Sequence, residues 1–193
     1  MNLETVRIRI ATPDDAAGVL AIYAPFVADT TVTFECAVPS EGDMRARIAH
    51  VLERYPYLVA EDEAGQVAGY AYASKFRPRE AYAWAVETSI YLRNDARGSG
   101  LSKRLYATLE RLLAAQGFTS MMACITIPNQ ASVSFHGKCG FEPVGSFSKC
   151  GYKHGAWLDV AWMEKHIAEH ASEPAPPVPF SEFRFKAAEF GMG

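Results

Sequence analysis

One stretch of the sequence, residues 87–106, constrains the fold more than any other, and it reads ETSIYLRNDARGSGLSKRLY. Its first six residues are extended in character and predict a strand, and Lys103–Gln116 has leucines at helical spacing. Between them lies a turn with Gly98 and Gly100. Backbone N–H groups at a helix start lack internal partners, and the helix dipole favours an anion there. Since glycine has no Cβ, a phosphate group can approach this backbone closely, with Arg97 adding a positive charge.

The spacing around this turn decides among phosphate-binding motifs. The Walker pattern needs Gly-Lys-Ser/Thr after four spacer residues and is absent, and the dinucleotide pattern needs glycine at the position of Lys103. The pattern present is Arg-Gly-x-Gly-x-small, which resembles the acetyl-coenzyme A loop of the GCN5-related N-acetyltransferase (GNAT) family. That family usually has Gly or Ala where this chain has Ser102. The resemblance implies that the coenzyme pyrophosphate binds at Arg97, Gly98, Ser99, Gly100, Leu101 and Ser102.

Composition sets the broad class. The chain has 193 residues, of which 49% are hydrophobic and 21% charged, which predicts one globular domain with a substantial core. A net charge of -3 gives no electrostatic footprint for nucleic acid or anionic membranes. No apolar run reaches the roughly 18 residues that span a bilayer, and no export signal is visible, so we expect a cytoplasmic protein. The four cysteines lack metal-site spacing, so we expect no metal.

The rest of the chain predicts a mixed, mostly antiparallel sheet. The GNAT resemblance implies an α/β (α+β) fold of about six or seven strands flanked by about four helices. Strands are expected at residues 6–10, 57–61, 67–76, 81–92, 119–127, 142–148 and 157–163. Helices are expected from Thr12, with Pro25 loosening or ending the first, from a capping box at Ser40 to about Tyr55, and over residues 103–116 and 131–138.

We assign residues 1–170 to a single domain and residues 171–193 to a C-terminal tail. Residues 173–179 contain four prolines, which favour an extended and mobile chain. The four phenylalanines that follow have no clean period. Two interpretations stay open: a mobile tail, or an arm that docks on its own domain or on a partner subunit.

A second cluster, residues 129–141, resembles another conserved segment of the GNAT family. In that family the asparagine of this segment contacts the pantetheine arm, and the helix after it lines the coenzyme slot. The resemblance therefore implies that Asn129 and Ser132 bind the coenzyme. The seventh residue after the asparagine is commonly a tyrosine that acts as general acid, and in this chain it is His136.

From Ile8 to about Val160 the chain resembles the phosphinothricin and methionine-sulfoximine acetyltransferases. The motifs that carry this resemblance are Thr33-Phe34-Glu35, Arg79-x-Ala81-Tyr82-x-Trp84, Glu87-x-Ser89-Ile90-Tyr91, Arg97 to Ser102, Pro128-Asn129, His136 and Lys153-His154-Gly155-x-Trp157-x-Asp159-Val160. The resemblance implies acetyl-CoA as the donor and a free α-amine on a small amino-acid-like molecule as the acceptor. It also implies a homodimer.

Acetyl transfer to an ammonium group needs a base, because the protonated amine is no nucleophile. Glu87 follows an apolar run, so burial can raise its pKa and suit it to that role; the alternative is an exposed strand-end carboxylate or a structural ion pair. His136 can protonate the leaving thiolate, can act on the amine, or is a packed histidine without a catalytic role. Donors to the oxyanion are expected from the backbone N–H groups of Ser89, Ile90, Tyr91 and Leu92.

The acceptor site is expected near the start of the strand that carries Glu87. An arginine suits bidentate capture of the acceptor's negative charge, although Arg77 and Arg79 can equally form a solvated turn. The residues expected to contact the acceptor are Phe34, Arg79, Glu80, Ala81, Trp84 and His136. Two rival functions stay open: the same transfer onto a polyamine, an antibiotic or a protein N-terminus, and a coenzyme A-binding module without turnover.

Overall fold

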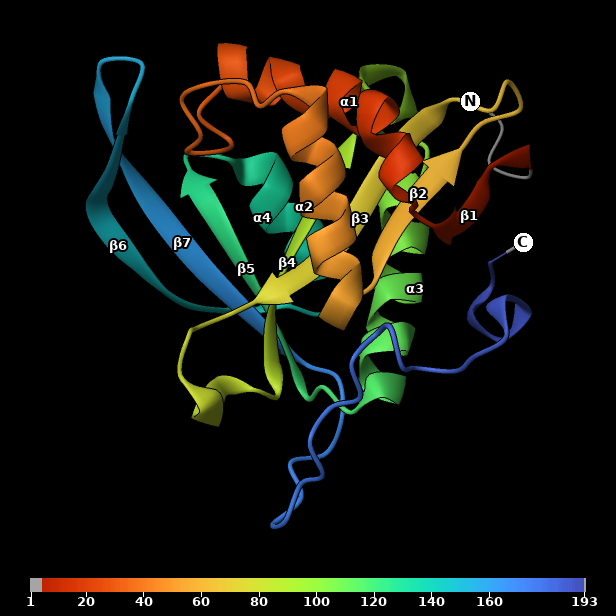
Figure 1. The fold of residues 1–193 in the computed structure, drawn as a ribbon. Coiled ribbons are helices and arrows are strands. Elements are labelled where there is room, and N and C mark those ends of the chain that lie inside the picture. Colours follow the sequence, from red (N-terminus) through yellow and green to blue (C-terminus); the bar gives the residue numbers. More distant parts are fainter. Residues whose placement is uncertain (1–4, 193) are drawn as a thin grey trace.

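The computed structural model describes residues 5–192, which form one seven-stranded sheet with helices on both faces (Figure 1). The strand order is β1-β2-β3-β4-β5-β7-β6, and every neighbouring pair is antiparallel except β4 and β5. The strands are β1 (Arg7–Ile10), β2 (Tyr57–Glu61), β3 (Val67–Lys75), β4 (Ala85–Leu92), β5 (Ser120–Ile127), β6 (Glu142–Lys153) and β7 (Ala156–His166). The α-helices are α1 (Ala16–Asp29), α2 (Glu41–Arg54), α3 (Leu101–Gln116) and α4 (Gln130–Lys138). The predicted mixed, mostly antiparallel sheet is confirmed.

Local sequence signals account for the ends of two helices. Ser40 caps α2: its Oγ accepts the N–H of Asp43 at 3.1 Å, and the Asp43 carboxylate accepts the N–H of Ser40 at 3.1 Å. Helix α3 begins after Gly100 and ends at Gly117, whose φ angles are 93° and 98°. Both angles lie in the left-handed region that glycine adopts without a steric penalty, so these glycines set the length of α3.

Three element boundaries differ from those expected. Helix α1 continues through Pro25 and ends at Asp29. Strand β4 begins at Ala85 rather than at residue 81, because Glu80–Tyr82 form the 3₁₀ turn η3. Strands β6 and β7 are longer than predicted and form one continuous hairpin, because His154 and Gly155 make the turn with φ of 49° and 76°.

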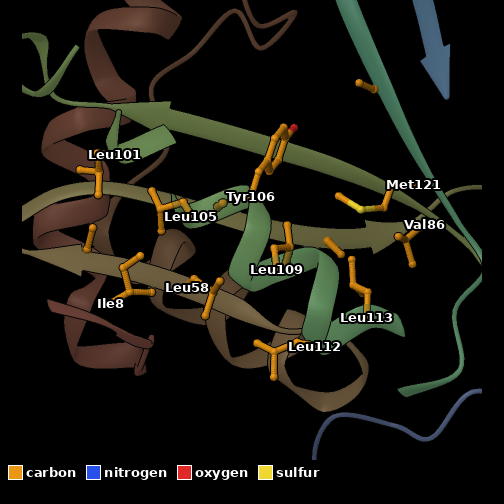
Figure 2. Packing of buried hydrophobic residues seen from close by; sticks show 14 of the residues in the cluster. Ile8, Leu58, Val86, Leu101, Leu105, Tyr106, Leu109, Leu112, Leu113 and Met121 are labelled. Carbon is orange, nitrogen blue, oxygen red and sulfur yellow. The ribbon is translucent and has the colours of Figure 1, made fainter. Parts of the chain in front are cut away.

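The two faces of the sheet bury separate apolar clusters. Leucines of α3 pack on one face against residues of β1, β2, β4 and β5, and Figure 2 shows them pointing at Ile8, Leu58, Val86 and Met121. Helices α1 and α2 cover the other face with a cluster that includes Val19, Ile48 and Tyr70. Because side chains alternate along a strand, β4 directs Val86 and Thr88 to the α3 side and Glu87, Ser89 and Tyr91 to the α1–α2 side.

Strands β4 and β5 separate after a short parallel contact. Among residues 5–192, their pairing covers Ala85 with Ser120, Val86 with Met121 and Glu87 with Met122, and it stops there. Strand β4 stays paired with β3 as far as Leu92 on its other edge. The sheet therefore opens between β4 and β5 just beyond Glu87. At that opening, the edge of β4 that points toward β5 is not paired with a strand.

The C-terminal segment lies against the domain, as the docked-arm interpretation expects. The indole N–H of Trp84 donates to the carbonyl of Ala175 at 2.8 Å, and the Gln116 carbonyl accepts the N–H of Val178 at 2.8 Å. The side chains of Phe180 and Met192 are buried. Figure 1 shows this segment, in blue, passing below the sheet and then along α3. No helix within residues 5–192 has the length and apolar character needed to cross a membrane.

Candidate active site

The opening between β4 and β5 is a narrow slot of about 70 Å³. It brings together residues that lie far apart in the sequence. Its lining residues are Val32, Thr88, Ser89, Ile90, Tyr91, Tyr106, Ala123, Cys124, Ile125, Thr126, Asn129, Ser132 and His136. Of the residues expected to bind the coenzyme or act in catalysis, the slot thus gathers Ser89 to Tyr91, Asn129, Ser132 and His136. Their contacts with the coenzyme stay predictions, whereas the structure shows that all of them line the same slot.

The glycine turn stands at the start of α3. Gly98 has a φ of 74°, and a Cβ built on it would meet no atom within 4 Å, so open space lies in front of this backbone. Ser99 braces the turn from within: its Oγ donates to the carbonyl of Ala96 at 2.7 Å and accepts the N–H of Leu101 at 3.3 Å. The Arg97 guanidinium lies 5.3 Å from the centre of the Phe26 ring. This geometry has the open backbone and the cation that an anion site needs.

Glu87 is half-buried on the α1–α2 side of the sheet, at the point where β4 and β5 separate. Burial raises the pKa of its carboxyl group, and the positive charge of Arg77 offsets part of that rise. Arg77 stacks on Phe76 and Trp162, with 4.6 Å and 5.0 Å between its guanidinium carbon and the ring centres. Arg77 is thus an exposed cation stacked on two aromatic rings, and its positive charge acts on the Glu87 carboxyl group.

The residues around Arg79 that are expected to contact the acceptor do not line the slot, and their contacts stay predictions. Arg79, Glu80 and Ala81 are exposed on the turn before β4. Ala81 and Trp84 instead border a separate hollow of about 240 Å³ beside Ser120 and His170. Glu80 and Ala81 lie in the 3₁₀ turn Glu80–Tyr82, which precedes β4.

Phe34 lies in the loop between α1 and α2. Its ring packs directly on Gly151 of β6, where any larger residue would collide with it. Two residues earlier, Val32 lines the slot itself. The loop after α1 therefore brings Val32 to the slot and Phe34 to β6, and the expected contact of Phe34 with the acceptor stays a prediction.

Polar contacts hold this loop from both sides. The Tyr23 hydroxyl lies 2.8 Å from Thr33 Oγ1 and donates to Glu35 at 3.1 Å, and Arg47 binds both carboxylate oxygens of Glu35 at 2.6 and 3.1 Å. From the β6 side, the Lys153 ammonium donates to the Thr33 carbonyl at 2.9 Å, and Lys153 is only 4% exposed. A buried cation and a bidentate pair thus fix the loop that carries Phe34.

A hollow of about 190 Å³ on the same face was not foreseen from the sequence. It is lined by Tyr23, Met44, Arg47, His50, Val51, Tyr57, Tyr70 and Tyr72. The signal was present, because tyrosines two apart on a strand share one face. The Tyr57 and Tyr72 rings stack at 4.8 Å between centres, so the floor of this hollow is rigid and aromatic.

His136 is 5% exposed and has a partner at each ring nitrogen. Its Nδ1 lies 2.8 Å from the carbonyl oxygen of Ser132, and its Nε2 lies 2.9 Å from the hydroxyl of Tyr106 on α3. Burial lowers the pKa of His136. The sequence suggested no role for Tyr106, because its contact with His136 crosses between two helices.

Among residues 5–192, no group of three or more His, Cys, Asp and Glu side chains is arranged to hold a metal ion. The slot, the glycine turn and Glu87 are therefore the features on which a chemical assignment rests.

Comparison with known proteins gives these features a family. The family model described as "Acetyltransferase (GNAT) domain" matches residues 8–162. A phosphinothricin N-acetyltransferase of Streptomyces viridochromogenes is 38% identical over 90% of this chain and 92% of its own length. An L-methionine sulfoximine/L-methionine sulfone acetyltransferase of Pseudomonas aeruginosa is 39% identical over 86% and 98%. The crystal structure of a GNAT superfamily phosphinothricin acetyltransferase from Sinorhizobium meliloti in complex with AcCoA superposes with a TM-score of 0.85 at 40% identity, covering 94% of this chain and all of that one.

Proposed function

The chain belongs to the GNAT acetyltransferase family and is an N-acetyltransferase, and we propose that it moves the acetyl group of acetyl-CoA to the α-amine of a small amino-acid-like acceptor. The acceptor class is that of phosphinothricin, methionine sulfoximine or methionine sulfone. The names of the relatives at 38–39% identity support this class. Family membership also removes the rival interpretation as a binding module without turnover.

The observation that carries the proposal is the separation of β4 from β5 directly beyond Glu87. The separation supplies three things close together: a slot between the strands, a β4 edge along Ser89 to Leu92 that β5 does not pair, and the Glu87 carboxylate at the last paired position before the slot. An acyl transferase needs the same three, since it must hold a donor arm, stabilise an oxyanion and remove a proton.

The residues of this chain fit acetyl-CoA as the donor substrate. The turn from Arg97 to Ser102 would hold the pyrophosphate, because Gly98 leaves open space before the backbone and α3 begins behind it. Asn129 and Ser132 line the slot, and the Asn129 side chain is fixed there because its Oδ1 accepts the N–H of Ser132 at 3.1 Å. They would contact the pantetheine arm.

Glu87 would act as the base, directly or through a water molecule. A carboxyl group whose pKa is raised by burial binds a proton more readily near neutral pH than an exposed one does. The free amine then attacks the acetyl carbon, the backbone N–H groups along Ser89 to Leu92 stabilise the oxyanion, and the thiolate leaves toward the wall formed by His136.

The acceptor would lie on the α1–α2 side, where Glu87 and Ser89 point. Arg77 supplies a positive charge near Glu87 for an acceptor's carboxylate, and Phe34 bounds the site at the loop after α1. The tyrosine-lined hollow offers aromatic surface for the acceptor's side chain. Arg79, Glu80, Ala81 and Trp84 do not line the slot, so any contact that they make with the acceptor would lie outside it.

We also propose a homodimer. The β6–β7 hairpin extends away from the helices (Figure 1) and carries Phe147, Tyr152 and Trp157 at 57%, 58% and 63% exposure. Aromatic surface of this kind is enriched at protein interfaces. Light scattering tests the dimer: a particle mass of one 21.2 kDa chain would contradict it.

A thiol-release assay with acetyl-CoA and a panel of amines tests the acceptor class. We expect turnover with methionine sulfoximine, methionine sulfone or phosphinothricin, and little with polyamines or peptides. Turnover confined to polyamines, aminoglycoside-type antibiotics or peptide N-termini would move the acceptor to that class and reject this one.

A further inference from the structure

Two polar side chains from different helices meet at the wall of the slot. Tyr106 of α3 and His136 of α4 both line it, as does Thr88 of β4. The Tyr106 hydroxyl oxygen lies 2.9 Å from His136 Nε2 and 3.3 Å from Thr88 Oγ1. Tyr106 is 2% exposed and belongs to the buried cluster that the α3 leucines form with the sheet (Figure 2), while its hydroxyl group reaches the slot wall.

The partners of His136 determine where its hydrogen lies. The carbonyl oxygen of Ser132 can only accept, so the Nδ1 atom 2.8 Å away carries the hydrogen. A neutral imidazole has a single N–H, so Nε2 is an acceptor and the Tyr106 hydroxyl donates to it. Because burial lowers the pKa of His136, the neutral form prevails near pH 7. In this state His136 has no hydrogen to give into the slot.

The hydroxyl of Thr88 is also committed, since it donates to the carbonyl of Met122 at 3.2 Å. Two hydroxyl groups beside His136 then remain as donors at this wall: that of Tyr106, which His136 Nε2 accepts, and that of Ser132, whose Oγ lies 3.3 Å from His136 Nδ1. Burial raises the pKa of Tyr106, so the phenol stays protonated over the range in which a thiol ionises. The titratable group in contact with it is His136, and the charges of Cys139 at the end of α4 and of Tyr72 on the other face of the sheet act on it from further away.

We propose that Tyr106 is the residue that hydrogen-bonds the departing sulfur of the donor, and that His136 is a positioning residue that holds the phenol for this task. The inference rests on the proposed function. As the amine nitrogen bonds to the acetyl carbon, the carbon–sulfur bond breaks and its electron pair stays on sulfur. The amine's surplus proton leaves through Glu87. The Tyr106 O–H turns from His136 Nε2 to the sulfur, and the thiolate takes a proton from water as it is released.

The test is the affinity of the intact protein for coenzyme A and for desulfo-coenzyme A, measured by calorimetry at about pH 7 and about pH 9.5, below and above the ionisation of an ordinary thiol. A hydrogen bond to a charged group favours the bound thiolate, so the preference of the wild type for coenzyme A should grow at least about tenfold with pH. Tyr106→Phe should remove this growth and leave the affinity for desulfo-coenzyme A unchanged.

A variant of His136 tests whether this residue only positions the Tyr106 phenol, and a variant of Tyr55 is the control. The amide oxygen of His136→Gln can still accept the Tyr106 O–H, so this variant should keep most of the pH-dependent preference. Tyr55→Phe is the matched control, because Tyr55 packs on Phe118 away from the slot and should behave as wild type.

Each outcome decides between the alternatives. A wild type that binds both ligands but shows no growing preference overturns the inference even if Tyr106→Phe does not fold. So does a Tyr106→Phe variant that keeps the preference, or a His136→Gln variant that loses it as fully as Tyr106→Phe should. A wild type that binds neither ligand instead rejects the proposed function, which is a separate failure.

Discussion

Gly98→Ala tests the phosphate turn with a change of one methyl group. The φ angle of Gly98 is 74°, and the space where a Cβ would stand contains no protein atom within 4 Å. The free protein therefore pays only the left-handed backbone strain of a residue with a Cβ, about 1–2 kcal/mol. For a chain of this size that strain lowers Tm by about 2–8 °C.

The effect on the ligand should be larger. If the pyrophosphate lies against this backbone, the added methyl group occupies its place and pushes it from the N–H groups of the turn. Losing even one charge-assisted hydrogen bond weakens binding by about 1.5–3 kcal/mol, a factor of at least about ten in Kd. Calorimetry with coenzyme A measures this directly, and thermal unfolding measures the strain in the same preparation.

Gly65→Ala is a matched control. Gly65 has a φ of 73° in the β2–β3 turn, and a Cβ there would meet only the end of Glu61 at 3.8 Å. Its loss of Tm should equal that of Gly98→Ala, while its affinity for coenzyme A should stay at the wild-type value. If both variants lose the same Tm and Gly98→Ala still binds coenzyme A within about twofold of wild type, the pyrophosphate lies elsewhere and the turn has been misassigned.

Three other changes have defined outcomes. Glu87→Gln should reduce kcat by about 10²–10⁴ near neutral pH with coenzyme affinity unchanged, and the loss should shrink as pH approaches the amine's own pKa; an unchanged pH–rate profile would exclude Glu87 as the base. Since burial raises the folded-state pKa of Glu87, its ionised form costs stability above that pKa, so Glu87→Gln should have the higher Tm at pH 7 and the difference should vanish as pH falls through the pKa; a lower Tm at pH 7 would argue for a structural ion pair. Leu109→Ala removes a fully buried side chain between α3 and the sheet and should cost about 2–5 kcal/mol in urea unfolding, and a loss below about 1 kcal/mol would contradict the packing seen in Figure 2.

Features encoded by adjacent residues were predictable from the sequence. The capping box at Ser40 and the glycine limits of α3 depend on contacts within a few residues, and the structure has both. The pattern from Arg97 to Ser102 likewise identified the family, because its spacing is local.

Features that depend on contacts across the fold were missed. Tyr106 gains its importance from His136, thirty positions away on another helix. The proline-rich segment is held because Gln116 of α3 meets Val178 through both its carbonyl and its side-chain amide, which donates to the Val178 carbonyl at 2.8 Å. The hydrogen bond from the Trp84 indole N–H to the Ala175 carbonyl, 91 positions away, was likewise not visible in the sequence, and the expected place of Trp84 in the acceptor site stays a prediction.

A crystal structure of the protein with coenzyme A and methionine sulfoximine tests the central claim most directly. We expect the diphosphate on the backbone of Gly98 to Ser102 and the sulfur between β4 and β5. We also expect the acceptor nitrogen about 3 Å from a Glu87 carboxylate oxygen or joined to it by one water molecule. A diphosphate bound away from the turn of Arg97 to Ser102, or a Glu87 carboxylate turned away from the sulfur, would contradict these assignments.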